Sequence, residues 1–216
     1  MKVSIIIPYR QCRGYLAEAV ASCEHQEGWK LGKDYDIIVQ HGDCGLGANM
    51  NLALKKAKGK YIKACADDDM LAPGCLEALY NFAEKGGYDF VCADAYNFEG
   101  NKKILDLSCS ELPEKVNQLA DHNTIHGGTV LYRRAVMPAW DEELWTGEEF
   151  EYNLRMASEG CKFGKLDEVV YWYRIHVKQK SLVYKSNDGD KILERIRFIR
   201  DKIQYQYLSC HKKIVK

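Results

Sequence analysis

Short apolar runs alternate with segments of helical periodicity in the first half of the chain. Apolar, β-branched runs lie at residues 3–7 (VSIII), 35–40 (YDIIVQ), 60–65 (KYIKAC) and 88–98 (YDFVCADAYNF), and each predicts a strand. Between them, residues 15–26, 45–59 and 73–87 have apolar positions at helical spacing, and the last two of these segments end in glycine. This alternation predicts an α/β fold with an open, mostly parallel sheet and helices on both faces.

The pattern is less regular in the second half. Residues 102–107 predict a strand that forms a hairpin with the strand before it, and residues 127–137 predict a strand that runs into a short helix. A helix with an acidic first turn is predicted at 147–160, followed by an aromatic-rich strand at 168–176. From Asp188 onward the isoleucines at 192, 196, 199 and 203 lie on one face of a predicted amphipathic helix.

Composition narrows the class of protein. The chain has 46% hydrophobic and 29% charged residues and a formal net charge of zero, so no overall field draws it to nucleic acid or to an anionic membrane. Its nine cysteines form no CxxC pair, and an odd count fits a disulfide framework poorly, so we expect buried free thiols. No apolar run approaches a membrane span, and the N-terminal run is broken by Pro8. We expect a soluble, cytoplasmic protein.

Three consecutive carboxylates, Asp67, Asp68 and Asp69, follow the third predicted strand. Like charges beside a buried strand repel one another, so a compensating positive charge is expected there. Hard divalent cations prefer carboxylate oxygens, and open α/β sheets bind ligands beyond the carboxyl ends of their strands. The structural alternative is an acidic turn that favours the N-terminus of the helix after Pro73.

Five segments, in this order, resemble family 2 glycosyltransferases of the GT-A fold. They are SIIIPYRQCRGYLAEAVASCEHQ, GANMNLALKKAKGKYI, ADDDMLAP, WDEELWTGEEFEYNLRMASEG and YWYRIHVKQKS, and together they cover residues 3 to about 181. The chain departs from the family pattern at four places. Ala66 replaces the first aspartate of the DxDD segment, QHGDC leaves only Asp43 in the turn after the second strand, Met50 precedes Asn51, and the acidic pair is Glu148-Glu149.

The resemblance implies a GT-A, Rossmann-like domain at residues 1–184 with a C-terminal amphipathic helix at 185–216. Residues 1–98 would form the nucleotide-sugar-binding half and residues 99–184 the acceptor and catalytic half. The reaction it implies is a metal-dependent, inverting transfer of a sugar from a nucleotide-sugar, expected to be a UDP-sugar. The metal would be Mn²⁺ or Mg²⁺, which neutralises the charge of the leaving diphosphate.

The resemblance also assigns candidate site residues. The general base would be Glu149, with Glu148 holding the acceptor or orienting a neighbour. The expected metal ligands are Asp68, Asp69 and His176. The expected donor-binding residues are Pro8, Tyr9, Arg10, Asp43, Asn51, Asp67 and Asp68, and the expected acceptor side comprises His126, Gly127, Trp145 and Arg174.

Several of these residues also have structural interpretations. Glu149 in a first turn stabilises a helix N-terminus, and a histidine at a strand end, such as His176, is often only hydrogen-bonded. Arg174 suits either a pyrophosphate contact or a salt bridge with the acidic helix. Trp145 suits either a sugar face or the core.

These residues fit several classes of acceptor. A glycan, a lipid-linked sugar, a protein or a small molecule all fit, and a modified nucleic-acid base fits the neutral charge less well. Two other functions remain open: a non-catalytic nucleotide-sugar-binding protein, and a sugar-phosphate nucleotidyltransferase, which the single glycine in PYRQCRG disfavours. The C-terminal helix would dock on the domain, form a homodimer or bind a partner chain, or lie peripherally on a membrane surface.

Overall fold

The computed structural model describes residues 1–180 apart from 102, 109 and 113–122, together with residues 194, 197–199 and 201. Within this part, eight strands form one sheet in the order β2-β1-β3-β7-β5-β8-β4, and β6 pairs with β5. The strands are β1 (Val3–Tyr9), β2 (Tyr35–His41), β3 (Tyr61–Ala64), β4 (Met70–Leu71), β5 (Phe90–Glu99), β6 (Lys103–Ser108), β7 (Leu131–Arg133) and β8 (Phe163–Arg174).

Most strands of the sheet run in one direction. Strand β1 is parallel to both β2 and β3, and β5 is parallel to β8. Strand β7 is antiparallel to both β3 and β5, so β3 and β5 point the same way on either side of it. Strands β4 and β6 are antiparallel to their neighbours. The prediction of an open, mostly parallel α/β sheet is confirmed.

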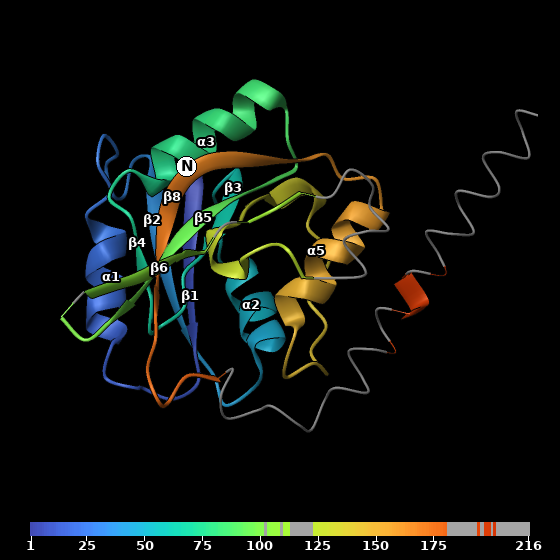
Figure 1. Ribbon diagram of the computed structural model, residues 1–216. Coiled ribbons are helices and arrows are strands. Elements are labelled where there is room, and N and C mark those ends of the chain that lie inside the picture. The colour runs from blue at the N-terminus through green and yellow to red at the C-terminus, as the bar shows by residue number, and fades with distance from the viewer. Residues whose placement is uncertain are drawn as a thin grey trace, which may run out of the picture.

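Helices cover both faces of the sheet, as Figure 1 shows, with α1 and α3 on one face and α2 and α5 on the other. Alternation along β1 explains why this strand is apolar throughout. Ile6 packs on the α2 and α5 face, whereas Ile5 and Ile7 pack on the α1 and α3 face. The helices are α1 (Leu16–Glu24), α2 (Leu46–Leu54), α3 (Cys75–Gly86) and α5 (Glu148–Ser158).

Two local predictions need correction. Strand β4 has only two residues and was not predicted, because so short a strand leaves no period in the sequence. Helix α2 ends at Leu54 and not at Gly59. A Cβ atom at Gly59 would lie 2.2 Å from the backbone nitrogen of Ser4, so this glycine permits a close approach to β1.

The predicted C-terminal helix lies mostly outside the described residues. Residues 194, 197–199 and 201 are helical, and Ile199 is 4% exposed and belongs to the hydrophobic core that also contains residues of α2 and α5. Phe198, beside it in the sequence, is 70% exposed. The isoleucines at 192, 196 and 203 are outside the described residues, so the docking of the predicted apolar face is seen only at Ile199.

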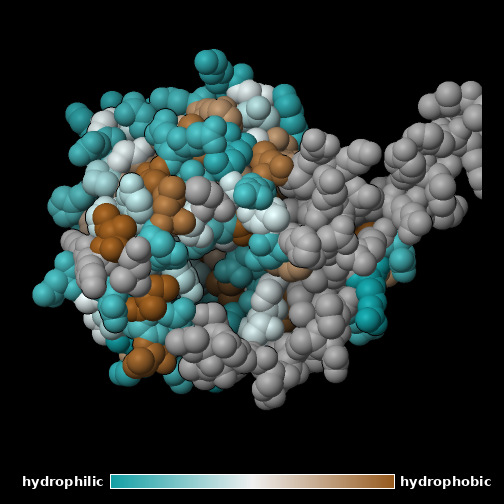
Figure 2. Space-filling model, in the orientation of Figure 1, coloured by the Kyte–Doolittle hydropathy of each residue, from teal (hydrophilic) through white to brown (hydrophobic). Residues whose placement is uncertain are grey.

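The polarity of the surface and the state of the cysteines agree with what the composition predicts. Figure 2 shows a largely hydrophilic face with apolar groups in small separate areas. Every cysteine that the structure describes is a free thiol, and four of them, Cys23, Cys65, Cys75 and Cys92, are buried. None of the described helices combines the length and the apolar character needed to cross a membrane.

Candidate active site

The loop between β3 and β4 carries the three aspartates. The chain leaves β3 at Ala64 and enters β4 at Met70, so Asp67, Asp68 and Asp69 lie just beyond the carboxyl end of β3. All three are nearly buried, with exposed fractions of 5%, 8% and 4%. Burial of adjacent carboxylates requires hydrogen bonds or opposite charge, and each aspartate obtains these differently.

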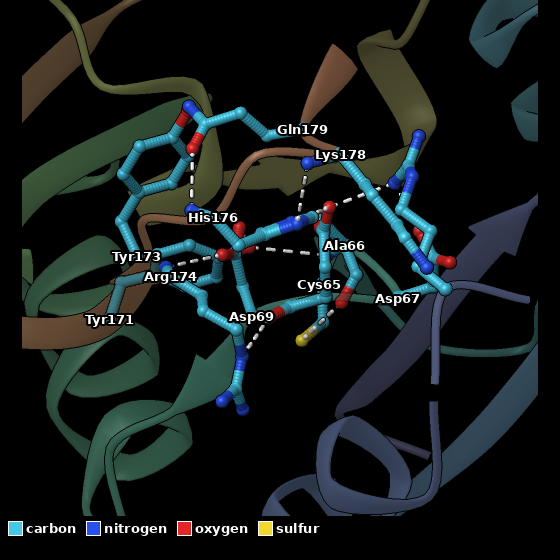
Figure 3. A network of polar contacts seen from close by, with 12 residues as sticks. Cys65, Ala66, Asp67, Asp69, Tyr171, Tyr173, Arg174, His176, Lys178 and Gln179 are labelled. Atoms are coloured by element: carbon cyan, nitrogen blue, oxygen red, sulfur yellow. Dashed lines mark hydrogen bonds and ion pairs between the residues drawn. The ribbon is translucent and has the colours of Figure 1, made fainter. Parts of the chain in front are cut away.

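Asp69 is held by β8. Its Oδ2 accepts a hydrogen bond from the Tyr171 hydroxyl at 2.8 Å, and its Oδ1 accepts one from the Arg174 backbone N–H at 2.8 Å, as Figure 3 shows. Burial and then the charge of Asp68 raise the pKa of Asp69 to about 8, against these hydrogen bonds. Both oxygens thus fix the loop to the sheet.

Asp67 and Asp68 share one guanidinium. Arg13 Nη1 lies 3.1 Å from Asp67 Oδ1 and 2.8 Å from Asp68 Oδ2. The other oxygen of Asp67 is buried and has no hydrogen-bond partner. Burial and then the charge of Asp68 raise the pKa of Asp67 to about 6, although Arg13 acts in the opposite direction. The unpartnered oxygen of Asp67 is therefore able to bind a cation or to accept a hydrogen bond.

His176 points at the same carboxylate. Its Nε2 lies 3.1 Å from Asp68 Oδ2, and its Nδ1 accepts the backbone N–H of Lys178 at 3.2 Å. Because Nδ1 accepts, the hydrogen-bond network assigns the ring proton to Nε2, which donates it to Asp68. Binding of a metal through Nε2 would need the proton to move to Nδ1 and the contact with Lys178 to open.

Arg174 supports the aspartate loop. Its Nε donates to the Asp68 carbonyl at 2.7 Å, and its Nη2 lies 3.2 Å from Glu18 Oε2. The guanidinium also lies over the rings of Tyr15 and Phe98, at 4.3 and 4.6 Å. The sequence placed Arg174 on the acceptor side, but its contacts are with the aspartate loop and α1.

The acidic pair begins α5. Glu148 is 2% exposed and forms an ion pair with Lys180, whereas Glu149 is only partly buried. Burial and then the charge of Glu149 raise the pKa of Glu148, against the effect of Lys180. Of the two, Glu149 is the carboxylate that solvent and an acceptor can reach.

A glycine turn connects Glu149 with the aspartates. A Cβ at Gly127 would lie 2.8 Å from Glu149 Cγ, and one at Gly128 would lie 2.4 Å from the Tyr171 ring. Both close approaches require glycine. The Tyr171 hydroxyl in turn donates to Asp69, so one unbroken series of contacts joins the acidic pair to the aspartate loop.

Two residues contact this turn: Lys63, which the sequence did not single out, and His126, which it predicted on the acceptor side. The buried Lys63 Nζ donates to the carbonyls of Ala64 and Gly128, and lies 5.0 Å from the centre of the Tyr171 ring. His126, just before the turn, is in ring contact with Tyr171 at 5.7 Å. Burial and then the charge of Lys63 lower the pKa of His126 to about 4.

The first two strands supply the remaining predicted donor residues. Pro8 is buried in β1, the Tyr9 ring lies 4.8 Å from that of His41, and Asp43 is exposed in the turn after β2. Arg10 lies over the Trp145 ring at 5.1 Å. A residue predicted on the donor side is therefore in contact with one predicted on the acceptor side.

Asn51 makes contacts that differ from the predicted donor role. Its Nδ2 donates to the Trp140 carbonyl at 3.0 Å and to Glu142 Oε1 at 2.8 Å, and its Oδ1 accepts the Trp140 N–H at 2.8 Å. The amide thus fastens α2 to the segment that leads toward α5.

Sequence reasoning missed Arg13, Tyr171, Lys63 and Lys180. Tyr171 lay inside the aromatic strand that was singled out, but nothing in its spacing distinguished it from Tyr173. Lys63 could have been recognised from the sequence, because a lysine within an apolar strand is unusual and suggests a specific partner. Arg13 and Lys180 come from segments far from the aspartates and from Glu148, so only the fold brings each charge to its partner.

The side chains of Asp67, Asp68 and His176 fit a divalent cation whose coordination is completed by a bound ligand. No group of three or more His, Cys, Asp or Glu side chains within the described ranges is arranged to hold a metal by itself. Asp68 Oδ2 and His176 Nε2, 3.1 Å apart, have the separation of two neighbouring ligands of one ion, and Asp67 offers an unpartnered oxygen. Mg²⁺ sites commonly combine one or two carboxylates with substrate phosphates.

Comparisons with known proteins identify relatives of this chain. The profile described as "Glycosyl transferase family 2" matches residues 30–138, half of the chain. An uncharacterized glycosyltransferase of Methanocaldococcus jannaschii is 26% identical over 148 residues, covering 64% of this chain and 50% of that protein. The uncharacterized glycosyltransferase EpsJ of Bacillus subtilis is 24% identical over 208 residues, covering 80% and 60%. The chain thus spans about half to three-fifths of these relatives.

Solved structures show the same fold. The crystal structure of S. aureus TarS 1-349 in complex with UDP-GlcNAc has a TM-score of 0.69 and 17% identity, covering 94% of this chain and 66% of that one. The complex of the same fragment with UDP has a TM-score of 0.67 and 17% identity, covering 98% and 72%. At this identity the likeness establishes the fold.

Proposed function

The chain belongs to glycosyl transferase family 2, and from that premise we propose that it transfers a sugar from a UDP-sugar to a hydroxyl acceptor with inversion. The observation that carries the proposal is the series of contacts from Asp69 through Tyr171 and Gly128 to Gly127 and Glu149. It supports the proposal because it joins the aspartate loop, whose carboxylates suit a diphosphate-bound cation, to a carboxylate suited to proton abstraction.

The donor side is formed by the first half of the chain. Arg10 and Arg13 follow β1, and both present guanidinium groups, which bind phosphate oxygens in a two-pronged geometry. The structural relative TarS was solved with UDP and with UDP-GlcNAc, which supports a uridine nucleotide as the first donor to test.

A divalent cation, Mn²⁺ or Mg²⁺, would be held by Asp68 with Asp67 beside it, and by His176 after its ring proton moves. When bound, such an ion neutralises charge on the leaving diphosphate. Asp69, predicted as a ligand from the sequence, is assigned instead to holding the loop through Tyr171 and Arg174.

Glu149 is the proposed general base. It removes the proton from the acceptor hydroxyl, whose oxygen forms a bond to the anomeric carbon as the bond from that carbon to the diphosphate breaks. Glu148, buried beside Glu149, forms an ion pair with Lys180 and holds the start of α5 in place. Trp145, stacked with Arg10, offers an aromatic face to a sugar.

Titration of UDP by calorimetry tests the donor assignment, first with Mn²⁺ and then with excess chelator. Binding that requires Mn²⁺ supports the proposed site. Binding without metal would place the diphosphate on the arginines and remove the metal from the proposal. If UDP, GDP, CDP and dTDP all fail to bind, the nucleotide-sugar assignment is wrong.

Replacement of Glu149 by Gln tests the chemistry. Release of UDP from a panel of UDP-sugars, with water as acceptor, should fall by about 10²-fold or more in E149Q, whereas UDP affinity should change little. The matched control is Glu168→Gln, which removes an exposed carboxylate of β8 and should leave both quantities unchanged. Full UDP release in E149Q would exclude Glu149 as the base, and no release in the wild type would favour a non-catalytic binding protein.

A further inference from the structure

One guanidinium stands between the two aspartates that are proposed to meet the metal. Arg13 comes from the loop after β1, and its Nη1 contacts Asp67 Oδ1 and Asp68 Oδ2 at 3.1 and 2.8 Å. The Arg13 side chain is 24% exposed, whereas those of Asp67 and Asp68 are 7% and 12% exposed. The arginine therefore covers the carboxylates from the solvent side.

Arg13 also supplies the charge that this pair needs. The guanidinium of Arg174 is directed at the Asp68 carbonyl and at Glu18, and not at the two carboxylate groups. His176 contacts Asp68 alone of the two, through Nε2, while its Nδ1 accepts the Lys178 N–H. Among the described residues, Arg13 is the permanently charged side chain that forms an ion pair with both carboxylates.

We propose that Arg13 is a displaceable counter-ion, which occupies the cation position between Asp67 and Asp68 until metal and nucleotide arrive together. The proposal rests on the function proposed above. A metal ion on Asp68 Oδ2 would lie within a few ångströms of Nη1, and two cations so close in a largely buried site repel strongly. The metal must therefore expel the guanidinium.

The donor gives the expelled guanidinium a new partner. Diphosphate oxygens bind arginine in a bidentate geometry, and Arg13 is exposed enough to turn toward them. Nucleotide should therefore strengthen metal binding, and metal should strengthen nucleotide binding by the same factor. Metal alone should bind weakly, because it has to break the Arg13 ion pairs without compensation.

Mn²⁺ binding without nucleotide tests this idea. Calorimetry or the electron paramagnetic resonance signal of free Mn²⁺ should show Arg13→Gln binding Mn²⁺ about tenfold more tightly than the wild type. UDP should enhance Mn²⁺ affinity in the wild type and much less in R13Q. The matched control is Lys85→Gln, which removes one exposed positive charge on α3 and should behave as the wild type does. Adding D68N to R13Q should abolish the gain.

The results separate the inference from the function. Equal Mn²⁺ affinity in R13Q and the wild type overturns the counter-ion role, even where UDP binds with metal. A gain in R13Q that persists although no nucleotide binds supports the counter-ion role and overturns the donor assignment. If R13Q is unfolded because its carboxylates lack a counter-ion, Mn²⁺ should restore the folded circular dichroism signal and chelator should remove it. Failure of Mn²⁺ to restore that signal also overturns the inference.

Discussion

Three consecutive aspartates have three different sets of partners. Asp69 is hydrogen-bonded to β8 through both oxygens, Asp68 meets Arg13 and His176, and Asp67 keeps one buried oxygen without a partner. The loop is thus hydrogen-bonded to the sheet at Asp69, whereas Asp67 at its other end keeps a carboxylate oxygen without a partner. At the scale of single residues, the proposed cation-binding role therefore belongs to Asp67 and Asp68.

His126 shows how burial couples one residue to pH. Its pKa is lowered to about 4, chiefly by burial and then by the charge of Lys63, whereas an unfolded chain has about 6.5. As pH falls from about 6.5 toward 4, the unfolded chain binds the proton first, so stability is lost over this range. We expect the wild type to lose about 2 kcal/mol of unfolding free energy between pH 7.5 and 5 through this residue.

Urea denaturation at the two pH values measures the effect. His126→Phe keeps an aromatic ring beside Tyr171 but cannot titrate, so it should lose about 2 kcal/mol less than the wild type. His25→Gln, at the exposed end of α1, should keep the dependence of the wild type. The same pH dependence in H126F and in the wild type would contradict the assignment.

At the scale of elements, sequence periodicity located the long strands and helices but not their neighbours. Strand β1 and helix α3 are predicted from the sequence, because the apolar run of the first and the amphipathic pattern of the second extend over several residues. Strand β7 lies within the strand predicted at 127–137, whereas β4, with only two residues, carries too short a pattern, although it completes the sheet beside β8. The three aspartates are consecutive, so the sequence alone shows them as a group. The contact of Arg13 with two of them spans at least 54 residues and is seen only in the folded structure.

The junction of α2 with the segment before α5 depends on Asn51. Asn51→Ala leaves the backbone N–H and carbonyl of Trp140 without these partners, and should cost about 1–3 kcal/mol of unfolding free energy. Because the amide is already engaged, UDP affinity should stay within about twofold. The control Leu52→Ala, 41% exposed on the same helix, should change stability by less than about 0.5 kcal/mol. Weaker UDP binding by N51A at unchanged stability would instead support the donor role predicted from the sequence.

At the scale of the whole molecule, the C-terminal segment contributes to one of two cores. Ile199 joins the core between the sheet and the α2 and α5 layer, while the α1 and α3 layer has its own set of buried residues. Ile199 is thus packed on the face of the sheet that α5, the helix of Glu149, also covers. The sequence predicted this docking as one of three uses of the helix, because periodicity shows an apolar face but not what covers it.

A neighbouring pair of residues tests this docking. Ile199→Ala should cost about 2–4 kcal/mol of unfolding free energy, because it leaves a cavity in the core. Phe198→Ala, one position earlier and 70% exposed, should cost less than about 0.5 kcal/mol. Equal losses measured by urea denaturation would mean that Ile199 is not packed in the core in solution.

The place of β7 in the sheet has a consequence during protein synthesis. Strand β3 ends at Ala64 and β5 begins at Phe90, but the strand that joins them, β7, spans Leu131–Arg133. A nascent chain that has emerged only as far as Glu99 therefore exposes the unpaired edges of both β3 and β5. Unpaired edges favour association with other chains, and contacts distant in sequence delay folding. The ribosome must release β7 before the centre of this sheet can close, so translation pauses ahead of residue 131 would prolong the period of greatest risk of aggregation.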